Sequence, residues 1–114
     1  MPASIRFYRT LGFALCFQDT AETPRYAVVA RDGAELHLQW ADAGQWQAGL
    51  DRPVVRLRVD DVDALFREFA ERGALADDTE LERPWAKPGD TPWGTREFHL
   101  RDPAGNGLHF FRTQ

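Results

Sequence analysis

The stretch from Pro92 to Phe111, PWGTREFHLRDPAGNGLHFF, contains two segments in which apolar and polar residues alternate, joined by a short polar turn. The alternation predicts strands over Thr95 to Arg101 and Gly107 to Thr113. Between them, Asp102 to Asn106 has the residue types that tight turns require. The stretch therefore predicts a β-hairpin, and it begins with a tryptophan held between a proline and a glycine.

Upstream of this hairpin, Val54 to Val59 alternates as a half-exposed strand does. Asp60 or Asp61 is placed to cap a helix that ends near Gly73, the clearest helix of the chain. Its apolar stripe consists of Val62, Leu65, Phe66 and Phe69. The segment that follows, up to Pro92, is rich in proline and predicts a loop bordered by a short strand.

The first half of the chain predicts a similar series of elements. Ser4 is expected to cap a short helix that ends at Gly12. Three β-rich segments follow: Phe13 to Gln18, Arg25 to Ala30 and Glu35 to Trp40, the last two joined by the hairpin signal Asp32-Gly33. The sequence thus predicts one α+β domain over residues 1–114, built from two repeated modules at about 1–44 and 53–114.

Composition excludes several classes of protein. A formal net charge of −4 disfavours nucleic acid as a partner and favours a cationic ligand, although solubility alone selects the same charge. No apolar run reaches the ~20 residues of a membrane span. Cys16, the only cysteine, cannot form a disulfide within the chain and is expected to be buried in a strand. We therefore expect a cytoplasmic protein.

Three motifs resemble the vicinal oxygen chelate superfamily, which includes glyoxalases, bleomycin-resistance proteins and extradiol dioxygenases. They are SIRFYRTLGF at 4–13, VDD at 59–61 and RDPAGN at 101–106. Within the superfamily, Pro92-Trp93-Gly94, Arg96-Glu97-Phe98 and Leu108-His109-Phe110 are most similar to the bleomycin-resistance proteins. The resemblance covers almost the whole chain.

The resemblance implies a fold of paired βαβββ modules, with the first module lacking its leading strand because Met1 to Ala3 are too few to form one. It also implies a homodimer with two equal sites at its interface, which sequesters a flat molecule of the bleomycin type without altering it. Trp93 corresponds to the tryptophan that stacks on the drug. Antibiotic resistance by drug binding, without a cofactor, is the function that this resemblance favours.

The physical reading of the tryptophans agrees with this. Trp93 lies between a stiff residue and an uncrowded one, which suits an aromatic face offered to a planar and cationic ligand. Trp85 is a candidate for a further aromatic wall of the site. Trp40 and Trp46 are candidates too, but they are equally well explained as filling of the core or of a dimer interface.

The superfamily's metal enzymes define the alternative function, a metal-dependent lyase or dioxygenase. By their pattern, His37, Val54 and His109 occupy metal-ligand positions, and a fourth ligand would lie on the missing strand. Val54 cannot coordinate a metal, and two histidines alone bind metal weakly. Alternation puts Glu35 on the face of His37, whereas no position for Glu97 follows from the sequence.

The histidines also have an interpretation without metal, in which His37 and His109 line a pocket as hydrogen-bonding groups. His99 is expected on a solvent-exposed surface without a role. An accessory domain that works only with a protein partner is a third, weaker possibility. The missing strand itself has two explanations: the native chain begins upstream of Met1, or a dimer partner covers the gap.

Overall fold

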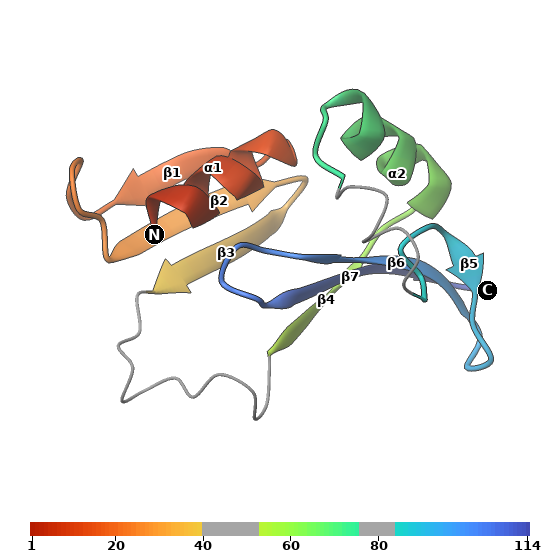
Figure 1. Ribbon diagram of the computed structural model, residues 1–114. Coiled ribbons are helices and arrows are strands. Elements are labelled where there is room, and N and C mark those ends of the chain that lie inside the picture. The colour runs from red at the N-terminus through yellow and green to blue at the C-terminus, as the bar shows by residue number, and fades with distance from the viewer. Residues whose placement is uncertain (40–52, 76–83) are drawn as a thin grey trace. The chain divides into compact units, whose positions relative to one another are not determined.

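The computed structural model describes residues 1–39, 53–75 and 84–114, and the chain divides into two compact units, Met1–Arg52 and Pro53–Gln114. Its mixed helices and strands have the α+β composition that the sequence predicts (Figure 1). The elements of the first unit are α1 (Pro2–Thr10), β1 (Ala14–Gln18), β2 (Tyr26–Arg31) and β3 (Ala34–Gln39). Those of the second are β4 (Val54–Arg58), α2 (Val62–Glu71), β5 (Gly89–Asp90), β6 (Thr95–Arg101) and β7 (Gly107–Thr113). No helix among the described residues is long and apolar enough to cross a membrane.

The first unit is an antiparallel sheet in the order β1-β2-β3, with α1 lying across one face (Figure 1). Among its described residues, the buried apolar side chains are Ile5, Tyr8, Leu11, Phe13, Ala27, Val28 and Val29. The predicted hairpin at Asp32-Gly33 is confirmed, because both residues have positive φ, at 51° and 82°, as a two-residue turn between twisted strands requires. Gly12 ends α1 with φ of 92°.

Two predictions for this unit are wrong. Ser4 does not cap α1, because the helix already begins at Pro2, whose fixed φ suits a first turn, and no side chain caps it. Cys16 is exposed rather than buried. The register of β1 against β2 shifts between Leu15 and Phe17, so Cys16 falls at a bulge where strict alternation is broken.

The second unit is a four-stranded sheet in the order β4-β7-β6-β5. β6 and β7 pair antiparallel from Thr95 opposite Thr113 to Arg101 opposite Gly107, which confirms the predicted hairpin and its strand ends. Asp102 fixes the turn between them, since its carboxylate accepts hydrogen bonds from Asn106 N at 2.8 Å and Ala104 N at 3.0 Å. β4 pairs parallel with β7 and places Arg56 opposite His109.

The helix α2 covers one face of this sheet (Figure 1). Asp61 caps it through a hydrogen bond from Ala64 N at 3.0 Å, as the sequence predicts. Phe69 is fully buried, and its ring meets Phe98 at 5.9 Å and Phe110 at 5.3 Å between centroids. Because side chains alternate along a strand, the residues next to Phe98 and Phe110 point to the opposite face of the sheet.

Candidate ligand-binding site

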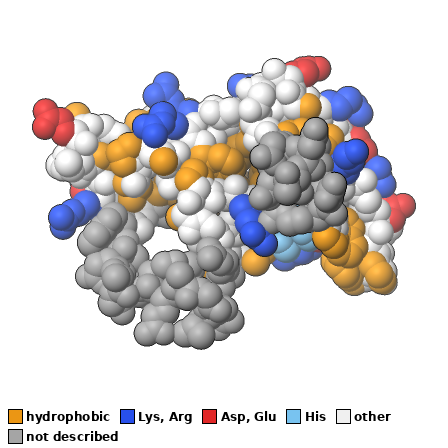
Figure 2. Space-filling view, viewed as in Figure 1, with side chains coloured by type: hydrophobic (Ala, Val, Ile, Leu, Met, Phe, Trp, Pro, Cys, Tyr) orange, Lys and Arg blue, Asp and Glu red, His pale blue; other side chains and the backbone are white. Residues whose placement is uncertain are grey.

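The face of the second sheet opposite α2 holds a group of polar and aromatic side chains, which we call the Glu97 face. Its members come from β4, β6, β7 and the turn before β6: Arg56, Trp93, Thr95, Glu97, His99, His109 and Phe111. In Figure 2, histidine side chains reach the surface of the molecule beside basic and hydrophobic side chains.

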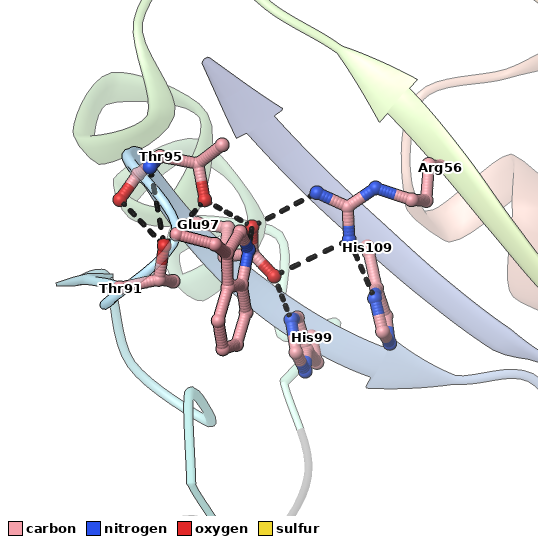
Figure 3. Close-up of polar contacts among 7 residues, drawn as sticks. Arg56, Thr91, Thr95, Glu97, His99 and His109 are labelled. Carbon is pink, nitrogen blue, oxygen red and sulfur yellow. Dashed lines mark hydrogen bonds and ion pairs between the residues drawn. The ribbon is translucent and has the colours of Figure 1, made fainter. Parts of the chain in front are cut away.

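Glu97 is the centre of this group, and its side chain is fully buried. One carboxylate oxygen accepts hydrogen bonds from Thr95 Oγ1 at 2.5 Å, Arg56 Nη2 at 3.0 Å and the indole nitrogen of Trp93 at 3.4 Å. His99 Nε2 donates to the other oxygen at 2.6 Å, and Arg56 Nη1 donates to it at 3.4 Å (Figure 3). One buried acceptor therefore orients groups from three elements.

These contacts fix the charge of Glu97. Burial alone would raise the pKa of its carboxyl group, but hydrogen bonds from Arg56, Thr95 and His99, with the positive charge of Arg56, lower it to about 2. A carboxylate that stays ionised at neutral pH and has no exposed surface is poorly suited to transfer protons to a ligand. The contacts of Glu97 are those of a structural hydrogen-bond acceptor.

His99 and His109 lie opposite each other on β6 and β7, and their rings stack with centroids 3.4 Å apart and planes 4° apart. Nδ1 of His109 accepts a hydrogen bond from Arg56 at 3.2 Å, so the neutral ring carries its proton on Nε2. Burial, then the nearby His99 and Arg56, lower the pKa of His109 to about 4. The expectation that His99 lies on a solvent-exposed surface is wrong, because its side chain is 22% exposed and β6 directs it to the same face as His109.

Trp93 is the exposed aromatic residue of this face, with 56% of its surface accessible. It stands in the turn before β6, where Thr91 N donates to Thr95 O at 2.8 Å. Gly94 has φ of 86°, and a Cβ there would meet nothing within 4 Å beyond its chain neighbours, so the backbone next to Trp93 borders open space. The indole is thus exposed and yet oriented through Glu97.

Trp85 extends the group of rings. Its indole lies 5.1 Å from the ring of Trp93 and 5.8 Å from that of His99. Its φ of 57° is unusual for a bulky residue, and its carbonyl accepts a hydrogen bond from His99 N at 2.7 Å. Trp93, Trp85, His99 and His109 therefore form a continuous line of rings, of which the sequence had suggested Trp93, Trp85 and His109.

The charge of the Glu97 face differs from that of the whole chain. Arg56 has 40% of its side chain exposed and lies 4.5 Å above the ring of Phe111, and Arg58 is exposed on the same strand. Glu97, the acidic side chain among the described residues of this face, is buried and paired. The described part of the face thus offers hydrogen-bond donors and positive charge to a ligand. This local charge is opposite in sign to the net charge of the chain, from which a cationic ligand was expected.

His37 belongs to the first unit and has different partners. Its Nδ1 is hydrogen-bonded to the hydroxyl of Tyr26, and its Nε2 lies 2.8 Å from Glu35, which confirms that His37 and Glu35 share a face. Phe17, 53% exposed, packs edge-on against Tyr26. The remaining aromatic candidates, Trp40 and Trp46, lie outside the described residues.

The metal-ligand pattern of the superfamily finds little support in the second unit. Val54 stands at its expected place at the start of β4, is 50% exposed and offers no donor atom. His109 is present, but its Nδ1 already accepts from Arg56 at 3.2 Å. Arg56 thus engages Glu97 and Nδ1 of His109, so a metal ion would have to displace these hydrogen bonds to bind at those atoms.

Sequence reasoning did not place Arg56 and His99 in the candidate site, and it weighed Glu97 only as a carboxylate of undetermined position. One signal was present: with β6 and β7 paired end to end, His99 falls opposite His109, and Glu97 lies two residues away on the same face. For Arg56 the sequence holds no such signal, because its position depends on a parallel pairing with a strand about fifty residues further along.

Comparisons with known proteins agree with this architecture. Residues 1–110 match the Glyoxalase/Bleomycin resistance protein/Dioxygenase superfamily. No curated protein sequence matches the chain.

Several solved structures are similar. A bleomycin-binding protein crystallised with bleomycin has a TM-score of 0.74 at 21% identity, over 100% of this chain and 90% of that one. TnmS3, an antibiotic binding protein from Streptomyces sp. CB03234, has a TM-score of 0.60 at 30% identity, over 98% and 84%. Lactoylglutathione lyase from Agrobacterium tumefaciens has a TM-score of 0.59 at 22% identity, over 97% and 84%. At such identities, the likenesses to the first and the third are likenesses of fold alone. From the family match over residues 1–110, the chain belongs to the glyoxalase/bleomycin resistance protein/dioxygenase superfamily.

Proposed function

We propose that the protein binds a flat heteroaromatic small molecule of the bleomycin type and sequesters it without chemical change, which would confer antibiotic resistance. The observation that carries the proposal is the state of Trp93: the residue is 56% exposed, while its indole nitrogen donates a hydrogen bond to the buried Glu97 at 3.4 Å. An aromatic plane fixed in direction but open on one side is suited to stacking on a planar ligand.

The surroundings of Trp93 support the same function. Trp85, His99 and His109 continue the aromatic surface, so a ligand longer than one ring system has further planes to contact. A positively charged part of the ligand would be held by cation–π attraction at Trp93, since Glu97 is already paired. Similarity to proteins whose names state bleomycin or antibiotic binding agrees with this class of ligand.

The other candidate function, a metal-dependent lyase or dioxygenase, has less support. Glu97, His99 and His109 are residue types that bind metals, but Arg56 donates hydrogen bonds to two of the three. The low pKa of Glu97 and its burial also leave it unsuited to act as a general base.

The test is a calorimetric titration of the metal-stripped protein with metal-free bleomycin. We expect a dissociation constant of about 1 μM or lower, which corresponds to roughly 8 kcal/mol. Trp93→Ala is expected to weaken binding about tenfold or more, whereas Trp93→Phe, which keeps a ring, should weaken it less. Equal urea midpoints of the variants would show that the fold is intact.

Two results would count against the proposal. The absence of binding heat at several temperatures, with no effect on Trp fluorescence, would remove bleomycin as the ligand. Wild-type affinity in Trp93→Ala would place the site elsewhere. We further propose that the protein is a cytoplasmic homodimer with this site at its interface, and a single-chain mass by light scattering at the titration concentration would contradict the dimer.

A further inference from the structure

Three side chains of the Glu97 face have the composition of a metal site. Glu97, His99 and His109 each offer a ligand atom, and these atoms lie within 4.8 Å of one another. Two imidazole nitrogens and a carboxylate oxygen are a ligand set that zinc and cobalt accept, with an open fourth position. By residue type and spacing alone, this cluster would hold a divalent transition metal.

The guanidinium of Arg56 binds to atoms of two of the three residues, Glu97 and His109. It donates to both oxygens of Glu97, at 3.4 and 3.0 Å, and to Nδ1 of His109 at 3.2 Å. The remaining donor, Nε2 of His99, gives its hydrogen to Glu97 at 2.6 Å. Each of the three residues is therefore engaged as a hydrogen-bonding partner, and one fixed positive charge lies among them (Figure 3).

The sheet itself sets the position of this cation. β4 pairs with β7 in a register that puts Arg56 directly opposite His109, and the guanidinium lies 4.5 Å from the centre of the Phe111 ring. A divalent ion entering the cluster would have to displace these hydrogen bonds and approach a like charge. Such an approach is unfavourable where burial reduces screening by solvent.

We propose that Arg56 is the resident cation of this cluster: it takes the place of a transition metal and closes a latent metal site formed by Glu97, His99 and His109. The side chain that neutralises the buried carboxylate is thereby also the one that excludes the metal. The proposal concerns the cluster alone, so it does not depend on which ligand binds at Trp93.

The test is a titration with Co²⁺, whose visible absorption reports bound nitrogen and oxygen ligands. All proteins carry His37→Ala, because His37 and Glu35 form another possible pair 2.8 Å apart. We expect Arg56→Met to bind Co²⁺ more tightly than this parent, by about tenfold or more. The reason is that the substitution removes the charged side chain that is hydrogen-bonded to Glu97 and His109. Arg56→Lys keeps a cation and should behave as the parent does.

Further variants identify the ligands and guard against misfolding. Adding His99→Ala to Arg56→Met should abolish the new absorption. Near-UV circular dichroism checks the fold, and Arg56→Gln, which removes the positive charge proposed to exclude the metal, is the substitute if Arg56→Met does not fold. The proposal is overturned if the parent binds Co²⁺ as tightly as folded Arg56→Met does and if adding His99→Ala to the parent abolishes that binding. It is also overturned if a folded variant without the arginine gains no site.

Discussion

Replacing Glu97 with glutamine tests whether this carboxylate organises the site. Glutamine keeps the shape of the side chain and one acceptor oxygen, but it removes the negative charge that Arg56, Thr95 and His99 contact. The amide NH₂ group of glutamine is a hydrogen-bond donor, and it would replace a carboxylate oxygen that accepts hydrogen bonds. It would therefore face other donors without an acceptor between them. We therefore expect a loss of stability rather than a neutral exchange.

The structure gives the size of this loss. A pKa lowered from 4.5 to about 2 corresponds to about 3 kcal/mol of preferential stabilisation of the ionised form in the folded state. Because glutamine keeps part of the hydrogen bonding, and Arg56 is 40% exposed and can be solvated, we expect Glu97→Gln to lower the free energy of unfolding by about 2–3 kcal/mol at pH 7.

The effect has a defined dependence on pH. The pKa of Glu97 is lowered in the folded state, so its contribution is fully present above pH 4.5 and is lost as the pH falls toward about 2. The difference between wild type and Glu97→Gln should therefore fall to less than half by about pH 3. Urea unfolding, followed by Trp fluorescence and far-UV circular dichroism at both pH values, measures it.

Glu35→Gln is the matched control, since Glu35 also bonds to a histidine two residues further along, His37, at 2.8 Å. Its side chain is 62% exposed, so this substitution should change stability by no more than about 0.5 kcal/mol. The reasoning is refuted if Glu97→Gln unfolds at the urea concentration of the wild type at pH 7, or if the difference is unchanged at pH 3.

Three further predictions concern the same unit. Burial and the nearby His99 and Arg56 lower the pKa of His109 to about 4, so the wild type should lose stability as the pH falls from 6.5 to 4. The urea midpoint of His109→Asn should depend less on pH in that window, and the same pH dependence as the wild type would contradict this. Gly94→Ala should destabilise by about 1 kcal/mol through its φ of 86° alone, and equal melting temperatures would argue against strain there. Phe69→Ala, at a fully buried ring, should cost about 3–5 kcal/mol in urea unfolding; a loss below 1 kcal/mol would mean that α2 does not form the core.

Local sequence signals were sufficient for much of the fold. The ends of β6 and β7, the cap of α2 at Asp61 and the turn at Asp32-Gly33 were all predicted. Each depends on a pattern within a few residues: alternation, a capping side chain, or a dipeptide that tolerates positive φ. Where one residue breaks the pattern, as at the bulge beside Cys16, the same reasoning fails.

By itself, then, the sequence determined the elements of the hairpin and the exposed tryptophan in front of it. Only the tertiary structure decided the chemistry behind Trp93, because that chemistry depends on contacts between distant strands. Arg56 reaches Glu97 across 41 residues of sequence, and only the parallel register of β4 on β7 brings them together. A buried charge is stable only beside its partner. Which carboxylate is buried, and which cation pairs with it, is therefore settled by strand pairing and not by local pattern.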